Sequence, residues 1–206
     1  MEIIQIGDPL EIAREIELKI KMNNKEIILP CTPENLEELV IGFAISEGLS
    51  KNPKVILNGY TVILEAERYT PLLPRITPKI KFKIDYVKRF IGLLDTDYYK
   101  KTRAYHTAII VSEDEYLRAY DVGRHNSIDK AIGLAYKRGF DFSKSFMVIT
   151  GRITGSVAKK CARAGIPLIA SKAAIIDSAI EVCRETGLSA ISFATNLVVN
   201  NGAIEV

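Results

Sequence analysis

The sequence contains no tryptophan and, in 206 residues, only three cysteines and two histidines. Cys31, Cys161 and Cys183 form no Cys-x-x-Cys pair, which excludes a disulfide scaffold and a paired-cysteine zinc site. His106 also lacks the glutamate two residues further on that a zinc deaminase requires. Few, unpaired cysteines are typical of a reducing compartment. We therefore expect a cytoplasmic protein that holds no metal ion through these residues.

The chain also lacks long apolar runs and a strong excess of charge. No stretch approaches the length of a membrane span, and the N-terminus lacks the basic start and apolar core of a signal peptide. With 28 basic and 25 acidic side chains the net charge is +3, which is too balanced to favour nucleic acid. Hydrophobic residues make up 48% of the chain, which excludes a largely disordered protein. We expect a globular protein that binds neither membranes nor nucleic acid.

Residues 1–78 are expected to form a small α+β lobe. Apolar and charged residues alternate over residues 16–22, and Asn23-Asn24 then predicts the turn of a hairpin. Thr32-Pro33-Glu34 has the order of a helix start, with a capping hydroxyl, a first-turn proline and an acid. Gly48 predicts the end of that helix. A second hairpin and a proline-rich connection at residues 69–78 complete the lobe.

Residues 79–206 are expected to form the core. A hairpin is predicted within residues 105–120, after which helices and strands alternate. The predicted order is helix 127–138, strand 146–150, helix 156–164, strand 166–170, helix 175–186 and strand 190–194, with a last hairpin through residues 200–202. Strand–helix alternation with short connections predicts a parallel sheet. Its ligands should lie beyond the carboxyl ends of the strands.

The first candidate binding motif is Asp-Val-Gly-Arg-His-Asn-Ser-Ile-Asp-Lys at residues 121–130. It lies on a turn that enters a predicted helix, where free backbone N–H groups and the helix dipole favour an anion. Arg124 and His125 could contact a phosphate, and Asn126 or Ser127 could cap the helix. The alternative is a capped helix with a surface pair between Asp121 and Arg124.

The second candidate motif is Thr-Gly-Arg-Ile-Thr-Gly-Ser at residues 150–156, between a predicted strand and a predicted helix. Its glycines would let the backbone approach a phosphate at Gly151 and Arg152. The glycine spacing and the absence of a following lysine exclude a P-loop. The alternative is that the glycines only make a tight turn, and for Gly155 this alternative is favoured.

Four segments, in order along nearly the whole chain, resemble the formate dehydrogenase accessory sulfurtransferase (FdhD) family. Residues 121–130 are similar to that family's Asp-Val-Gly-Arg-His-Asn signature. The other three matches are Cys31–Gly48, Tyr105–Ala108, and Thr150–Arg152 together with Ala162–Pro167.

The resemblance implies a cytidine-deaminase-like, three-layer α/β/α core with a mixed sheet and no zinc, joined to the smaller N-terminal α+β lobe. It also implies that the chain handles the bis-molybdopterin guanine dinucleotide cofactor, with molybdenum or tungsten, and its sulfuration. The implied partners are a formate dehydrogenase or related molybdenum or tungsten enzyme, a cysteine desulfurase and a second copy of the chain.

Together, the motifs and the resemblance point to one cofactor site with no catalytic residue and no metal ligand assigned. The expected cofactor-binding residues are His106, Asp121, Gly123, Arg124, His125, Asn126, Gly151, Arg152, Phe193, Ala194, Thr195, Asn196, Leu197 and Val198.

The sequence departs from the family pattern at three places. The interval between Tyr69 and Ile84 contains no cysteine, although the family carries sulfur on a Cys-Gly-x-Cys-Gly loop there. Arg103-Ala104-Tyr105 replaces two glycines before the histidine, and an arginine is missing near the C-terminus. A persulfide needs a thiolate. Cys161 and Cys183 lie on apolar helix faces, so Cys31 is the only cysteine with a claim to reactivity.

Three functions remain open from the sequence. The first is the family's sulfurtransferase, and the second is a cofactor-binding chaperone without covalent chemistry. The third is a nucleotide-processing enzyme that uses His106, His125 and Asp121 as acid–base groups. The absent cysteine loop favours the second over the first.

Overall fold

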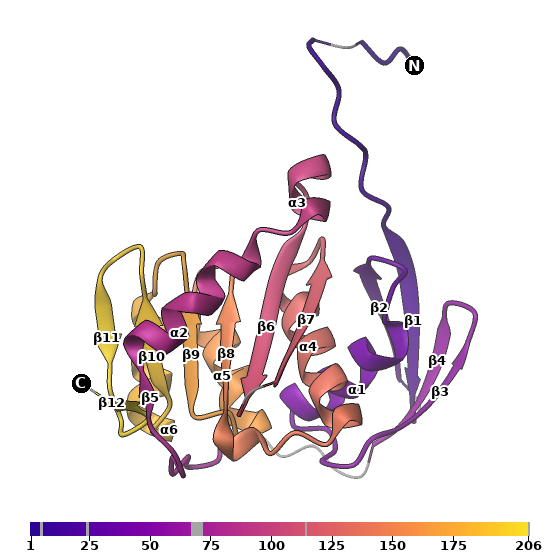
Figure 1. The fold of residues 1–206 in the computed structure, drawn as a ribbon. Coiled ribbons are helices and arrows are strands. Elements are labelled where there is room, and N and C mark those ends of the chain that lie inside the picture. The colour runs from indigo at the N-terminus through magenta and orange to yellow at the C-terminus, as the bar shows by residue number, and fades with distance from the viewer. Residues whose placement is uncertain (5, 24, 67–71, 114, 206) are drawn as a thin grey trace.

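The computed structural model describes residues 1–4, 6–23, 25–66, 72–113 and 115–205, and it contains two main sheets with their helices (Figure 1). Part of the predicted connection between the lobes, residues 69–71, lies outside the described residues. Within the described ranges, no helix is both long enough and apolar enough to span a membrane.

The small lobe is a four-stranded sheet covered by one helix. Its elements are β1 (Ile16–Met22), β2 (Lys25–Cys31), α1 (Leu36–Ser46), β3 (Lys54–Asn58) and β4 (Thr61–Glu65), and the strand order is β2-β1-β4-β3. Both predicted hairpins are present, and β1 and β4 pair in parallel between them. Alternation in β1 buries Leu18 and Ile20 with Leu39 of α1, which explains the sequence pattern.

The main sheet has six strands in the order β11-β10-β9-β8-β6-β7. The strands are β6 (His106–Ser112), β7 (Glu115–Asp121), β8 (Ser145–Ile149), β9 (Leu168–Ser171), β10 (Ser189–Ser192) and β11 (Leu197–Val199). The central strands β8, β9 and β10 are parallel, as their alternation with helices predicted. The antiparallel neighbours β6, β7 and β11 make the sheet mixed.

Helices and a short strand pair cover the two faces of this sheet. One face carries α4 (Arg124–Arg138), α5 (Gly155–Ala164) and α6 (Asp177–Thr186); the other carries α2 (Ile84–Ile91), β5 (Phe82–Lys83) and β12 (Ile204–Glu205). Figure 1 shows α2 crossing the strands, with η1 (Gly92–Leu94) and α3 (Asp97–Thr102) after it. The short turn η2 (Phe142–Lys144) precedes β8. Strands buried on both faces explain the continuous apolar runs of the sequence.

Two predicted helix caps are wrong. Asn35, with φ of 54°, precedes α1, and the Thr32 hydroxyl bonds Asp121 and Lys130 instead. The helix α4 begins at Arg124 after Gly123, so neither Asn126 nor Ser127 is its cap. Tertiary hydrogen bonds have taken the side chains of Thr32 and Asn126, and Ser127 donates to Arg124 O within the first turn of α4.

The predicted C-terminal hairpin through residues 200–202 is also wrong. β11 pairs antiparallel with β10, and β12 pairs in parallel with β5 on the far face of the sheet. Asn201 instead donates its side-chain amide to Cys183 O and Leu188 O, at 3.0 and 2.7 Å. The turn-forming residues therefore send the chain from one layer to another.

The helices α1 and α4 join the lobes by unusually close packing. A Cβ atom added at Gly42 would lie 1.7 Å from Asp129 O, and one added at Gly133 would lie 1.9 Å from Glu38 O. Only glycine allows these backbones to approach so closely.

Two buried ionic clusters lie at the same junction. Lys130 Nζ lies 2.7 Å from Asp121 Oδ2, both side chains are fully buried, and the same carboxylate oxygen accepts from the amide and hydroxyl of Thr32. In the second cluster, Lys160 Nζ lies 2.9 Å from Asp129 Oδ2. Ser46 of α1 donates to Asp129 at 2.6 Å. In each cluster the two opposite charges belong to the core, and small-lobe residues complete their hydrogen bonding: Thr32 in the first cluster, and Ser46 and Glu47 in the second.

Replacing Lys130 by methionine should destabilise the protein by about 3–5 kcal/mol, because Asp121 would keep a buried and unpaired charge. Lys137→Met is the matched control, since Lys137 pairs with Glu37 and Glu38 at the surface and should cost at most about 1 kcal/mol. Urea unfolding of both variants gives the free energies. Equal, small losses would mean that the buried Asp121–Lys130 pair does not stabilise the fold.

Candidate functional site

Polar residues from several strands meet at one edge of the main sheet. Thr150, Lys172 and Phe193 follow the parallel strands β8, β9 and β10. Because β6 runs antiparallel to β8, His106 at its start lies at the same edge, where Thr150 Oγ1 is 3.3 Å from His106 Nδ1. This is the edge at which ligands of open α/β sheets bind.

The two candidate motifs contact each other at Gly151. A Cβ atom built there would lie 3.5 Å from Cβ of Arg124 and 3.9 Å from His106 Nδ1. Gly151 therefore lies between a cationic side chain and an imidazole, where the absence of a side chain leaves both accessible. The expected meeting of the 121–130 and 150–152 segments is confirmed, and cofactor binding by them stays a prediction.

Three residues of the first motif shape the turn from inside. Asp121 Oδ1 accepts from the Gly123 amide at 2.8 Å and from Asn126 Nδ2 at 3.0 Å. Asn126 Nδ2 also donates to Pro30 O at 2.7 Å. A Cβ at Gly123 would lie 2.7 Å from the Asn126 amide, which explains the glycine. The predicted surface pair of Asp121 with Arg124 is wrong: Asp121 is buried against Lys130, and Arg124 is exposed.

In the second motif the exposed Arg152 is available to a ligand, whereas two of the backbone N–H groups are not. Gly155 N donates to Ser178 Oγ at 3.1 Å, and Val157 N donates to Thr154 Oγ1 at 3.4 Å. These amides of the α5 N-terminus already have acceptors, so the turn interpretation fits Gly155. Arg152 is exposed beside them.

The C-terminal segment lies further along the same edge. Phe193 N donates to Ser171 O at 2.9 Å, and Thr195 Oγ1 donates to Ser192 Oγ at 2.8 Å. The remaining expected residues are the exposed Ala194 and Asn196, and Leu197 and Val198 of β11. The segment thus adjoins the end of β9, with β9 between it and Gly151.

A cavity of about 280 Å³ opens at the His106 side of this edge. Its lining includes Asp95, Tyr99, Arg103, Tyr105, His106, Thr150 and Lys172. Of these, His106 alone was among the expected site residues. Lys172 could have been found, because it lies two residues after the predicted parallel strand 166–170. Asp95 carries no local signal, since only the path of the chain after α2 brings it to the sheet edge.

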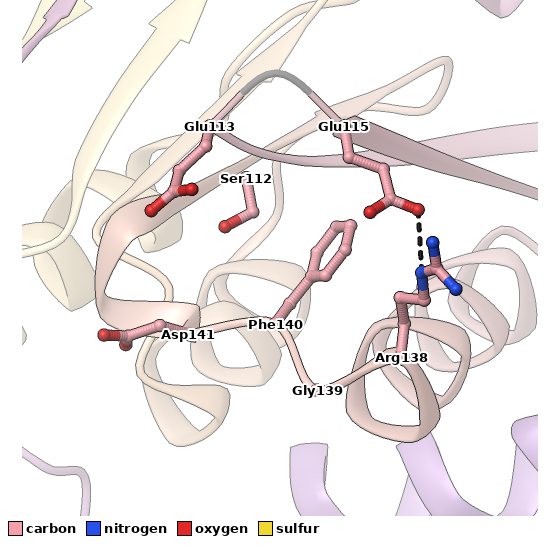
Figure 2. Close-up of a pocket in the computed structure, with 7 residues that line it drawn as sticks. All are labelled: Ser112, Glu113, Glu115, Arg138, Gly139, Phe140 and Asp141. Atoms are coloured by element: carbon pink, nitrogen blue, oxygen red, sulfur yellow. Dashed lines mark hydrogen bonds and ion pairs between the residues drawn. The ribbon is translucent and has the colours of Figure 1, made fainter.

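A second hollow, of about 510 Å³, lies at the other end of β6 (Figure 2). Glu113, Glu115 and Asp141 line it, and Glu115 pairs with Arg138 at 2.8 Å. Figure 2 shows the Phe140 ring pointing between Ser112 and that pair. Carboxylates dominate this hollow, so it does not suit an anionic ligand.

The surroundings of both histidines favour the neutral form of the imidazole. Burial lowers the pKa of His106, and the neighbouring Arg124 lowers it further. The pKa of His125 is also lowered, first by burial and then by Lys160 and Arg124. His125 Nε2 lies 3.1 Å from Ser156 Oγ. Because Asp121 is fully buried and bonded to Lys130, the three residues do not form an exposed acid–base set.

The three cysteines are buried, and burial is the main reason why their pKa values are high. The pKa rises to about 12 for Cys31, with a further contribution from Asp121, to about 12 for Cys161 and to about 11 for Cys183. Among the described residues no group of three or more His, Cys, Asp or Glu is arranged to hold a metal ion.

Acid should destabilise the fold through the two histidines. Their folded-state pKa values lie below the usual value of about 6.5, so the unfolded chain binds more protons there. The free energy of unfolding should therefore fall as the pH drops below about 6.5. The double variant His106→Gln, His125→Gln should show a flatter decline in urea unfolding between pH 7.5 and 5.5. Parallel declines would contradict this account.

Known proteins of one family match this chain over most of its length. The pattern that describes the FdhD/NarQ family matches residues 57–200. Protein FdhD of Methanocaldococcus jannaschii is 31% identical, over 82% of this chain and 77% of its own length. The sulfur carrier protein FdhD of Bacillus subtilis is 27% identical, over 95% of this chain and 88% of its own length.

A solved structure shares the fold. The crystal structure of a putative formate dehydrogenase accessory protein from Desulfotalea psychrophila superposes with a TM-score of 0.79 at 21% identity. The match covers 94% of this chain and 90% of that one. The family pattern and the sequence identity over most of the chain show that this protein belongs to the FdhD/NarQ family.

Proposed function

We propose that the chain is an accessory protein for the maturation of a formate dehydrogenase, or of a related molybdenum or tungsten enzyme. In this proposal it binds bis-molybdopterin guanine dinucleotide, as its cargo, at the carboxyl edge of the main sheet. The main observation in favour of this proposal is that Gly151 lies between Arg124 and His106. A glycine flanked by an exposed guanidinium and a neutral imidazole suits the close approach of a phosphate.

The names of the relatives support the maturation step. Several are called sulfur carrier protein FdhD, and the solved structure is that of a putative formate dehydrogenase accessory protein. The family resemblance also predicts a homodimer, a desulfurase partner, a cytoplasmic location and a cytidine-deaminase-like core. The mixed sheet between two covering layers supports the last of these predictions.

A specific observation favours the non-catalytic form of this function. A sulfur carrier needs an accessible thiolate, and each of the three thiols in this chain is buried with a raised pKa. Cys31 lies in the small-lobe core beside the Asp121–Lys130 pair. We therefore propose that the chain holds the cofactor while sulfur is carried by another protein.

Guanosine diphosphate should bind, and Arg124→Ala and Arg152→Ala should each weaken binding about tenfold or more. A charge-assisted hydrogen bond contributes about 1.5–3 kcal/mol. Calorimetry measures the affinities. Arg138→Ala is the matched control, because Arg138 is an exposed arginine paired with Glu115 at the other end of β6. Unchanged affinity in both site variants would remove the basic turn from the binding site.

The native protein should accept no sulfur from a cysteine desulfurase. The test is incubation with desulfurase and cysteine, followed by intact-mass measurement for an added sulfur atom. The unfolded chain in urea is the control, where the thiols are exposed and should react. A persulfide on native Cys31 that disappears in Cys31→Ser would restore a sulfurtransferase with a relocated nucleophile.

A further inference from the structure

We propose that the 510 Å³ hollow at the far end of β6 is a docking site for an arginine side chain of a partner protein. The hollow lies at the end of β6 opposite to His106, so it is separate from the candidate cofactor site. A partner bound in it would leave the carboxyl edge of the main sheet free. The inference goes beyond the proposed function and does not depend on the cargo that the chain holds.

The charges that line the hollow favour a cation. Three carboxylates line it, those of Glu113, Glu115 and Asp141, against one guanidinium. Glu115 is paired with Arg138 at 2.8 Å, and Asp141 lies 3.7 Å from Lys79 Nζ. Glu113 forms no ion pair with any residue that the structure describes. The carboxylate of Glu113 is therefore available to a cationic ligand.

The end of a helix adds to the negative potential of the hollow. Gly139, with φ of 81°, ends the 15-residue helix α4 and lines the hollow. The carbonyl groups of the last turn give the C-terminus of a helix a partial negative charge, which attracts cations. The helix end and the Glu113 carboxylate therefore act on a ligand in the same direction.

A buried hydroxyl group independently indicates a ligand with N–H donors. Ser112 is only 9% exposed, and its hydroxyl makes no hydrogen bond to any residue within the described ranges. Figure 2 shows this hydroxyl directed into the hollow, on the side of Glu113. Buried polar groups without a partner are rare in folded proteins. An N–H group of a bound guanidinium would supply the hydrogen bond that the Ser112 oxygen lacks.

The aromatic lining favours a guanidinium over a metal ion. The half-buried Phe140 ring points between Ser112 and the Glu115–Arg138 pair (Figure 2). A guanidinium is flat, stacks on aromatic rings and carries five N–H donors, which suits one ring, one carboxylate and one hydroxyl together. A volume of about 510 Å³ also lies in the range of sites that hold molecules larger than an ion.

The surroundings of the hollow suit a protein rather than free arginine. The Tyr86 hydroxyl donates to Glu113 O at 2.9 Å, which ties α2 to the turn that carries this carboxylate. A site held in place in this way needs little ordering when a partner binds. Tyr116, next to Glu115, is 44% exposed and extends the surface beyond the hollow. Tyrosine and arginine are the residues that most often contribute strongly to protein interfaces.

The test is an NMR titration of the full chain with a short peptide that carries one arginine between glycines. The amide resonances of Ser112, Gly139 and Phe140 should shift together. A peptide with citrulline, which has nearly the same shape and no charge, should bind about tenfold more weakly or less, because it forms no charge-assisted hydrogen bond.

Two variants test the assigned contacts. Glu113→Gln should weaken binding of the arginine peptide about tenfold, and Ser112→Ala about threefold. Glu26→Gln is the matched control, because Glu26 is an exposed glutamate beside the hairpin turn of β1 and β2 in the small lobe, and it should bind as the wild type does. Urea unfolding verifies that each variant is folded.

Four results would overturn the docking site. They are equal binding of the arginine and citrulline peptides, unchanged affinity in Glu113→Gln, and shifts that lie elsewhere on the chain. The fourth is displacement of the peptide by magnesium ions or spermidine at a lower concentration than that of the peptide, which would assign the hollow to a free cation. Each of these results leaves the proposed function at the opposite edge of the sheet intact.

Discussion

The buried contact among Asp121, Lys130 and Thr32 is the interaction on which the rest of the structure depends. Lys130 and Asp121 are fully buried and lie 2.7 Å apart, and Thr32 of the small lobe completes their hydrogen bonding. Moving the small lobe away would remove the hydrogen bonds between Thr32 and this pair and leave buried polar groups without partners, which is costly. The small lobe, the helix α4 and the end of β7 are therefore obliged to take up one relative position.

That position also shapes the candidate site. The second oxygen of Asp121 holds the Gly123 amide and the Asn126 side chain, and these set the turn that carries Arg124 and His125. The residues of the 121–130 motif thus have two different roles. Its buried polar residues position the turn, and its exposed arginine meets Gly151 and His106 at the sheet edge.

The proposed binding role of this edge is consistent with the groups that lie there. The pKa values of its histidines are lowered, Arg124 and Arg152 are exposed, and the three thiols are buried in the cores of the two lobes. Asp95, which pairs with Lys172, lines the cavity beside His106 together with Tyr99 and Tyr105.

Most of the element order could be predicted from the sequence, because alternation in β1 and the apolar runs of β8 to β10 reflect one-sided and two-sided burial. The sequence also predicted that His106, Arg124 and Gly151 belong to one site, and they lie together because the strand–helix order brings strand ends to one edge. The role of Thr32, the partner of Asp121, the path of residues 197–205 and the place of Asp95 became apparent in the folded chain alone. Those outcomes depend on contacts between residues far apart in the chain, about which local periodicity and capping patterns carry no information.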